Sequence, residues 1–491
     1  MTDRRKFLKN IAGCSLALSF PAIFNSCSKK NEKPNVLFIA IDDLNDWASI
    51  LGGRPNVHTP NMDRLAAKGV VFTNAHCAAP ACNPSRTSVF TGIRPSTSGV
   101  YFNRSHWRSS PALKNAVTIP EYFRSNGYRV VGGGKLFHCL SWIQTSYGKS
   151  QNDPDIWDEY FPSKTKPMPD FVWPKEITKN EDETISWDPF TSPNSENRPS
   201  YFFDWGPLKE PDEKTADYKV VDWAIEELQK KYEKPFFQAV GIFRPHIPWF
   251  VPQKYFDLYP LENIDLPLIQ ENDLDDCSDV GKSFCRRKWQ EWIVKNDLWK
   301  ESIQAYLASI SYADAQLGRL LDAFENSDYV DNTIIVLWSD HGMHIGEKEH
   351  WEKFTLWEES TRVPLMFVAP RISKSGTRCD EPVNLLDIYP TLIELSGGEP
   401  NIDLEGKSLL PLLQNSSLET NRAVVTTYGK NNHGVRSKQW RYIHYNDGSE
   451  ELYDHQNDPN EFTNIAYQEE FEKIKKDLAK WLPEINNDLV N

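Results

Sequence analysis

Two apolar runs that each end in acidic residues constrain the fold of this chain most. Residues 36–41 read VLFIAI and are followed by DD, and residues 333–338 read TIIVLW and are followed by SDH. Continuous β-branched runs of this length are typical of parallel strands that are buried on both faces. In α/β sheets, ligands bind beyond the carboxyl ends of the strands. The sequence therefore predicts an α/β fold with its functional site at that edge of a parallel sheet.

The residues that follow the two runs are candidates for one metal site. Asp42 and Asp43 are adjacent carboxylates, which repel each other unless a cation lies between them. Asp340 and His341 would reach the same edge of the sheet. Oxygen ligands favour a hard cation, Ca²⁺ or Mg²⁺, and the imidazole is a less typical ligand for either ion. The alternative is that each pair is only solvated at a strand end or caps a helix.

A short segment around Cys82 combines the residue types of an anion-binding nucleophile. A thiol ahead of a helix lies where backbone N–H groups favour a negatively charged oxygen. Pro84 suits the first helical turn, Ser85 can cap the helix, and Arg86 carries a fork of donors for sulfate or phosphate oxygens. The alternative is a buried structural cysteine before a surface helix. Because short motifs produce false matches, the segment has to be weighed with its context.

This segment resembles the C-x-P-S-R-x-x-x-L-T-G signature of the type I sulfatases, with Phe90 in the place of Leu. The acidic pairs, Lys135 and His246 follow the same order along the chain as in that family. The resemblance is closest to the iduronate-2-sulfatase branch, through residues 101–103, 107–108, 118–123, 134–138 and 351–354. It implies an alkaline-phosphatase-like α/β sandwich, in which helices flank a large central, mostly parallel sheet and a smaller antiparallel-sheet subdomain forms the C-terminal part.

The resemblance implies a role for each matching residue. A maturation enzyme that generates formylglycine (3-oxoalanine) would oxidise Cys82, and the hydrated aldehyde would be the nucleophile. The implied ligands of Ca²⁺ are Asp42, Asp43, Asp340, His341 and the modified Cys82. The residues implied to hold the hydrate, the sulfate and the leaving oxygen are Arg86, Lys135, His138, His246 and Lys353. Single lysines are usually solvated and single histidines usually structural, so these roles depend on the resemblance.

The same branch implies a 2-O-sulfated uronic acid as the substrate, either iduronate or an unsaturated uronate, in glycosaminoglycan fragments of the heparin, heparan or dermatan type. Such a sugar carries a carboxylate close to its sulfate, so the pocket needs a second cationic contact. Arg104 and Arg108, beside Trp107, are the candidates for binding this substrate. For each arginine, the alternative is an ion pair with a surface acid.

Two other functions stay open from the sequence. A relative in the same superfamily could act on another sulfated sugar position, or on a phosphonate or phosphodiester. The cysteine at position 82 argues against the phosphatases, which have Ser or Thr there. The non-enzymatic alternative is an exported glycan-binding lipoprotein on a degenerate scaffold, but no expected catalytic position is missing. The formal net charge of −14 argues against nucleic acid as a partner.

The N-terminal residues 1–27 are predicted to be an export signal. Arg4 and Arg5 resemble a twin-arginine signal, and the apolar residues 11–24 are too few to span a membrane. Cys27 is a candidate site of lipidation at the end of this segment. The protein is therefore expected in the periplasm or as a cell-surface lipoprotein, with a membrane contact only through that lipid.

The rest of the chain divides into a predicted catalytic domain, residues 34–412, and a predicted C-terminal subdomain, residues 413–491. Within the first, residues 141–211 are rich in Pro, Trp, Asp and Ser, which indicates a set of functional loops. The number of cysteines implies no disulfide framework, although Cys277 and Cys285 could pair.

Overall fold

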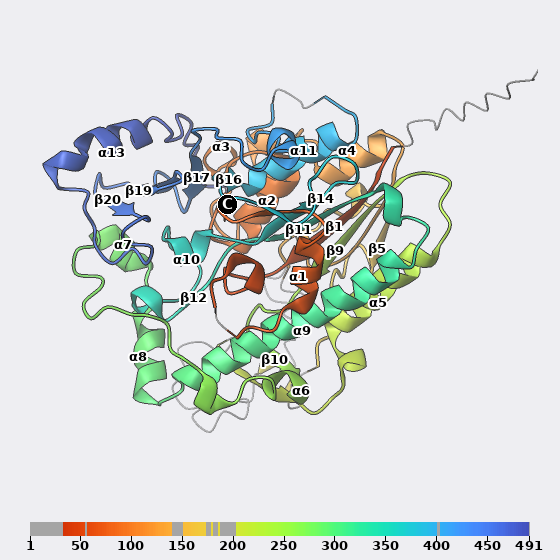
Figure 1. Cartoon of the computed structure of the whole chain (residues 1–491), viewed down its shortest axis with the longest axis horizontal. Helices are drawn as coiled ribbons and strands as arrows, with labels where there is room; N and C mark the ends of the chain where they lie inside the picture. The colour runs from red at the N-terminus through yellow and green to blue at the C-terminus, as the bar shows by residue number, and fades with distance from the viewer. Residues whose placement is uncertain are drawn as a thin grey trace, which may run out of the picture. The chain divides into compact units, whose positions relative to one another are not determined.

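The computed structural model of the chain describes residues 33–54, 56–139, 151–172, 178–179, 185–186, 203–399 and 403–490. Residues 33–491 form one compact unit, and Figure 1 labels many of its helices and strands. The predicted export signal, residues 1–27, lies outside the described residues, as does much of the predicted loop set at 141–211. In the described part of the chain, no helix is both long enough and apolar enough to cross a membrane.

An eight-stranded, mostly parallel sheet forms the centre of the unit (Figure 1). Its strands are β1 (Asn35–Ile41), β2 (Val70–Phe72), β4 (Arg129–Gly134), β5 (Glu159–Phe161), β9 (Phe236–Ile242), β11 (Thr333–Ser339), β14 (Leu365–Val368) and β15 (Thr377–Cys379). Their order is β15-β2-β14-β11-β1-β9-β4-β5. The strands from β11 to β5 run parallel, whereas β14 is antiparallel to both of its neighbours. The predicted fold class is confirmed.

Helices cover both faces of this sheet, and each face has its own apolar core. The helices on one face are α5 (Ala216–Gln229) and α9 (Trp299–Glu325), and those on the other are α2 (Cys82–Thr91), α4 (Ile119–Ser125) and α11 (Ile388–Leu395). Leu37 and Ile39 of β1 point into the first core, and Val36 and Phe38 point into the second. Both β1 and β11 are buried along their whole length, which explains why their sequences are apolar without alternation.

The remaining elements are short and connect or flank this sandwich. The helices are α1 (Pro60–Ala66), α3 (Pro95–Ser98), α6 (Gln253–Phe256), α7 (Asp279–Phe284), α8 (Arg287–Lys295), α10 (Glu358–Thr361) and α12 (Leu410–Gln414). The strands are β3 (Ala75–His76), β6 (Thr178–Lys179), β7 (Ile185–Ser186), β8 (Trp205–Leu208), β10 (Trp249–Pro252), β12 (His344–Ile345), β13 (Trp351–Glu352) and β16 (Val383–Asn384), and they pair as β8-β10, β12-β13, β3-β16 and β6-β7.

A separate antiparallel sheet forms the C-terminal part of the chain, as predicted. Its strands are β17 (Val424–Thr427), β18 (His433–Arg436), β19 (Trp440–His444) and β20 (Glu450–Asp454), and they pair in chain order. The helix α13 (Glu472–Ala479) packs against it through Leu478, which shares a core with Val435 and Leu452. This sheet and the central sheet belong to one compact unit, and the domain boundary at residue 413 stays a prediction.

Three glycines end β4 just before Lys135. The sequence alone allows a flexible loop at residues 132–134, but the structure places them in a buried strand. A Cβ atom at Gly132 would lie 2.8 Å from the ring of Trp157, and Gly134, with φ of 81°, would bring one within 2.0 Å of the Gly241 carbonyl. Glycine is therefore required for the close packing of β4 that fixes the position of Lys135.

The disulfide that the sequence left open between Cys277 and Cys285 is not formed, because both residues carry free thiols. The Cys277 sulfur lies 3.7 Å from the Tyr453 hydroxyl instead. Burial raises the pKa of the Cys285 thiol to about 12. Thiol oxidation starts from the thiolate, so burial protects this pair from joining.

Candidate active site

The N-terminus of α2 brings Cys82 to the carboxyl edge of the central sheet. Ala81 is extended and Cys82 is the first residue of the helix, with Pro84 in the first turn as predicted. The expected cap by Ser85 is wrong, because Ser85 lies inside the helix and its hydroxyl donates to the Asp340 carbonyl at 2.6 Å. Ser85 therefore ties α2 to the end of β11.

Cys82 is fully buried among cationic groups. Its Sγ lies 3.2 Å from Nε2 of His341 and 4.0 Å from Nζ of Lys135. Burial by itself would raise the pKa of the Cys82 thiol, but the charges of Lys135 and Lys353 outweigh burial and lower it. A lowered pKa is typical of reactive cysteines, whereas the inert buried cysteines of cores have raised pKa values. These surroundings therefore favour a functional cysteine over a merely structural one.

Arg86 joins the ends of three strands through one buried guanidinium. Its Nε donates to Asp340 at 2.8 Å and its Nη2 to Asp42 at 2.9 Å. Its Nη1 donates to the carbonyl groups of Lys135 and Leu136 at 2.6 and 2.8 Å. Burial opposes ionisation of Asp340, but Arg86 holds the pKa of this carboxyl well below its usual range. Only the planar fork of an arginine can make these bonds at once.

Two lysines neutralise the remaining charge of the acidic pair. Lys135 forms an ion pair with Asp42, and Nζ of Lys353 lies 2.8 Å from both carboxylate oxygens of Asp43. Burial raises the pKa of Asp43 to about 7 despite the charge of Lys353. His341 Nε2 lies 3.3 Å from Asp43, and its Nδ1 donates to the Gly342 carbonyl. Asp43 therefore lies in a place where further positive charge would be stabilised.

The predicted metal ligands lie together in the structure. Asp42, Asp43, Cys82 and His341 each offer one ligand atom, and these atoms lie within 4.8 Å of one another. Asp340 lies beside this group, with Oδ2 3.5 Å from Nε2 of His341. Three buried carboxylates and one imidazole fit a divalent cation that prefers oxygen, as the sequence predicted.

Two further histidines line the site. His246 follows β9, donates from Nδ1 to the Ile247 carbonyl, and turns Nε2 to within 3.8 Å of Asp43. His138 follows Lys135, and its buried Nδ1 has no hydrogen-bond partner among the described residues. Burial, with a contribution from the charge of Lys135, holds the pKa of both histidines well below its usual value. Burial thus favours the neutral form of both imidazoles.

The three residues predicted to select the substrate lie apart from this cluster. Trp107 is buried, stacks on Phe137 at a centroid distance of 5.5 Å and donates to the Gln151 carbonyl. Arg108 has the contacts that the sequence left as its alternative: ion pairs with Glu121 at 3.1 Å and with Asp153 at 3.0 Å.

Arg104 differs from Arg108. It is exposed, its guanidinium lies 5.7 Å from the ring centroid of Phe102, and no carboxylate of the described residues pairs with it. The neighbouring Asn103 accepts a hydrogen bond from the backbone N–H of Asn83, in the first turn of α2. The loop that carries Arg104 is thus attached next to Cys82.

Sequence reasoning did not single out several residues that hold the site in place. Tyr306 of α9 donates to the Asp43 carbonyl at 2.8 Å, and Asp43 has a φ of 58°. Asp217 of α5 accepts from the backbone N–H groups of Phe243 and Arg244, just before His246. Neither residue lies in a motif. The one signal in the sequence that could have indicated Asp217 was an acidic residue on the buried face of the α5 helix.

Known proteins share both the sequence and the fold. The sulfatase family model matches residues 34–398, and the model described as N-sulphoglucosamine sulphohydrolase, C-terminal, matches residues 346–488. A sulfatase of Formosa agariphila is 43% identical over 469 residues, covering 93% of this chain and 88% of that protein. The iduronate 2-sulfatase of Homo sapiens is 31% identical over 404 residues, covering 74% of this chain and 69% of that protein.

Solved structures share the fold at lower identity. A protein crystallised with its substrate D-glucosamine-2-N,6-O-disulfate has a TM-score of 0.68 at 22% identity, over 91% of this chain and 96% of that one. A 2-O glycosaminoglycan sulfatase has a TM-score of 0.63 at 22% identity, over 91% and 90%. The fold is therefore of the alkaline-phosphatase-like α/β class. The sulfatase family model, which matches residues 34–398, covers the strands of the central sheet and every predicted metal ligand. The chain therefore belongs to the sulfatase family.

Replacing Arg86 by methionine is expected to lower the free energy of unfolding by about 3–5 kcal/mol, because Asp42 and Asp340 would stay buried without their shared partner. Unfolding in urea, followed by tryptophan fluorescence, measures this loss. The control Arg129→Met removes a half-exposed pair with Glu159 and should cost less than about 1 kcal/mol. Equally small losses in both variants would contradict the bridging role of Arg86.

Proposed function

We propose that this protein is a sulfatase that hydrolyses sulfate esters of sugars, with oxidised Cys82 as its nucleophile. The observation that carries the proposal is the position of Cys82: the first residue of α2, buried 3.2 Å from His341 and facing Lys135. The helix N-terminus and the cations favour an anionic group at this point. Membership of the sulfatase family supports the same reaction.

The buried acids would hold a divalent cation, which we propose to be Ca²⁺. Its ligands would be Asp42, Asp43, Asp340 and His341, with residue 82 as a further ligand. When bound, such an ion polarises sulfate oxygens and lowers the pKa of a nearby hydroxyl group. Lys135 and Lys353, which now bind the carboxylates, would then be free to stabilise the negative charge of the sulfate.

The chemistry follows from the hydrated aldehyde that oxidation of Cys82 would create. One of its two hydroxyl groups gives up its proton as its oxygen attacks sulfur, and the bond between sulfur and the sugar oxygen breaks, with the electron pair leaving on the sugar oxygen, which takes up a proton. The second hydroxyl then loses its proton and forms the C=O double bond again, while the bond between the same carbon and the sulfated oxygen breaks, so that sulfate leaves with that electron pair. Water rehydrates the aldehyde. Arg86 is already bound to two carboxylates, so its part is to fix α2 against the strand ends.

A proton must reach the departing sugar oxygen, and His246 is the proposed donor. Its Nδ1 is engaged with the Ile247 carbonyl, so Nε2 is the atom directed at the site. Burial holds the pKa of His246 well below its usual value, but a bound sulfate ester adds a negative charge that favours the imidazolium. His138 would contact the sulfate from the other side of Lys135.

As the particular substrate we propose 2-O-sulfated uronic acid in glycosaminoglycan fragments of the heparin, heparan or dermatan type. The identity of 31% to human iduronate 2-sulfatase supports this choice. The exposed Arg104 is our candidate for the uronate carboxylate, since a guanidinium binds a carboxylate with two parallel bonds. A screen of defined sulfated disaccharides tests the choice, and preference for 6-O-sulfated glucosamine would overturn it.

Two proposals concern the environment of the protein. We propose that a formylglycine-generating enzyme acts on the Cys82 segment, because the C-x-P-S-R sequence matches the family signature. We also propose export to the periplasm or the cell surface, guided by residues 1–27, with Cys27 as the site of a lipid anchor in the second case.

Mass spectrometry of the peptide that carries Cys82 is expected to find the aldehyde in active protein. Cys82→Ala should abolish turnover and leave the fold intact, because alanine at this buried position removes the reacting atom without adding volume. A neighbouring buried thiol provides the control, since Cys77→Ala should keep activity. Full activity with an unmodified thiol would refute the mechanism.

Removal of metal by exhaustive chelation should abolish activity, and Ca²⁺ should restore it. Asp43→Asn removes one charged ligand and should lower kcat/KM by more than the roughly 10–100-fold that loss of an outer-shell partner costs. Asp222→Asn, which only disrupts a surface pair with Arg319, is the matched control. Elemental analysis that finds zinc, or full activity after chelation, would contradict the proposed site.

Arg104→Ala should lower kcat/KM on 2-O-sulfated uronates by about tenfold to a hundredfold, and leave hydrolysis of a small aryl sulfate nearly unchanged. Arg108→Ala breaks ion pairs with Glu121 and Asp153, so it should lower both activities alike or only stability. Comparison of the two substrates in each variant is the measurement. If Arg104→Ala affects both substrates equally, Arg104 does not read the carboxylate.

A further inference from the structure

The segment that carries Lys353 has an unusual backbone. Glu352 and Phe354, on either side of Lys353, have φ values of 76° and 85°, in the left-handed region that residues with a Cβ rarely adopt. Residues persist in such conformations only where their surroundings hold them there. Because Lys353 must keep Nζ against Asp43, the position of this lysine depends on what holds the segment.

Around Lys353 itself, Arg286 pairs with Glu352 at 2.8 Å. His350 donates to the Lys353 carbonyl at 2.7 Å, and the Phe354 N–H donates to the Pro80 carbonyl at 3.0 Å.

The segment that follows is held from the C-terminal sheet. Glu358 follows Lys353 closely in the chain and forms ion pairs with Arg436 of β18, at 3.1 Å, and with Arg441 of β19. The fully buried Arg441 also donates to the Leu356 carbonyl at 2.9 Å and to the Thr361 hydroxyl at 3.0 Å. One guanidinium thus binds the segment at three points.

Glu461 completes this network. It accepts a hydrogen bond from the backbone N–H of Glu358 at 2.8 Å and pairs with Arg441 at 2.5 Å and with His455 at 2.9 Å. Glu358, His455 and Glu461 bring their ligand atoms within 4.8 Å, as the residues of a metal site do. Here Arg436 and Arg441 already neutralise the two carboxylates, so the group is an ionic clamp. We call Glu358, Arg441 and Glu461 the C-terminal clamp.

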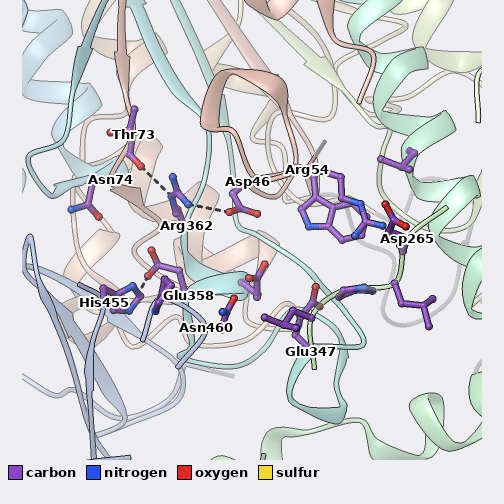
Figure 2. A pocket seen from close by; sticks show the side chains of 18 of the residues that line it. Asp46, Arg54, Thr73, Asn74, Asp265, Glu347, Glu358, Arg362, His455 and Asn460 are labelled. Atoms are coloured by element: carbon purple, nitrogen blue, oxygen red, sulfur yellow. Dashed lines mark hydrogen bonds and ion pairs between the residues drawn. The ribbon is translucent and has the colours of Figure 1, made fainter. Parts of the chain in front are cut away.

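The same segment is tied to the central sheet on its other side. Figure 2 shows Glu358 and His455 at a cavity of about 940 Å³, with Arg362 between Thr73 and Asp46. Arg362 donates to the Thr73 carbonyl and to Asp46, each at 3.0 Å. Asp46 lies on the loop that follows Asp43. The segment from Leu356 to Arg362 therefore connects the C-terminal sheet with the loop of the acidic pair.

We infer that the C-terminal clamp positions Lys353 for the reaction, with Arg441 as its principal positioning residue. Among the described residues, the C-terminal sheet supplies none of the side chains that surround Cys82, so its part in the reaction would be to fix the strained segment. This inference rests on the proposed sulfatase activity. It goes beyond that activity because it assigns the C-terminal subdomain, whose described residues supply no side chain to the site, a role in positioning Lys353.

A double-mutant cycle tests the inference. Arg441→Lys keeps the charge but loses the fork, and should lower kcat on a sulfate ester by about tenfold, with a smaller change in KM. If Arg441 acts through Lys353, the double variant with Lys353→Ala should be no slower than Lys353→Ala alone. If the fold-losses in kcat of the two single variants multiply in the double variant, the inference is overturned. The formylglycine content of each variant is measured, so that incomplete maturation of Cys82 is not mistaken for an effect of the clamp.

The control is Lys475→Met, which removes the ion pairs of a buried lysine with the partly exposed Glu450 and Glu472 in the same subdomain. It should leave kcat unchanged. If it does lower kcat, its fold-loss should multiply with the fold-loss caused by Lys353→Ala. If Arg441→Lys does not fold, Trp357→Phe carries the test, because it keeps an aromatic ring in the same segment but removes the bond from the indole N–H to Glu451 of β20, at 2.9 Å, and part of the packing of the buried indole.

Hydrogen–deuterium exchange separates this inference from the proposed function. Arg441→Lys should increase exchange in residues 351–361, and Lys475→Met should not. This readout needs no turnover, so it tests the clamp even if the protein hydrolyses no sulfate ester. Unchanged exchange in residues 351–361 of Arg441→Lys would overturn the clamp itself, whatever the substrate.

Discussion

The buried guanidinium of Arg86 lies between Asp42 and Asp340, at the ends of two parallel strands, and donates to the backbone beyond a third. Without it, two buried carboxylates would lose their shared partner, and among the described residues Asp42 would keep only its pair with Lys135 and Asp340 only its pair with His341, at a cost of several kcal/mol. With it, the ends of β1, β11 and β4 are fixed relative to α2, whose first residue is Cys82. The rest of the site depends on this bridge, because the other charged groups around Cys82 either follow β1, β4 or β11 or pack against the residues at the ends of these strands and of α2.

The charges around Cys82 are paired, and this pairing explains how so many can be buried. Three carboxylates face Arg86, Lys135 and Lys353. Burial opposes the charged form of His341, but the neighbouring negative charges, Asp340 first, raise its pKa to about 9. The three permanent cations are not equivalent. Arg86 is held by four hydrogen bonds and cannot leave its acids. Lys135 and Lys353 end in point charges on flexible stems, which can turn from a carboxylate to another anion with little change elsewhere. A fixed arginine and two adaptable lysines suit the proposed site, which would bind a cation and then an anion.

Much of the fold and of the site could be predicted from the sequence, because the signals are local. The run at 36–41 is apolar at every position and the run at 333–338 at every position after Thr333, so both are expected to be strands covered on both faces. The motif at Cys82 placed a helix N-terminus, and the strand ends placed the acids at one edge. The substitution of Phe90 for leucine was also visible, and its ring stacks on Phe137 at 4.3 Å in the core below the site.

Local patterns of the chain show which elements form and which residues lie at their ends, because apolar periodicity and helix starts extend over about ten residues. Which charges meet follows from the packing of segments that are far apart in the chain. Lys353 and Asp43 are 310 positions apart, and Ser85 and Asp340 are 255 apart. No local pattern could show that Ser85 bonds to a strand end, that Arg108 is taken by two acids, or that Arg441 holds the lysine segment. A buried charge pairs with the opposite charge that lies close to it in space and is desolvated with it, and residues adjacent in the sequence encode neither property.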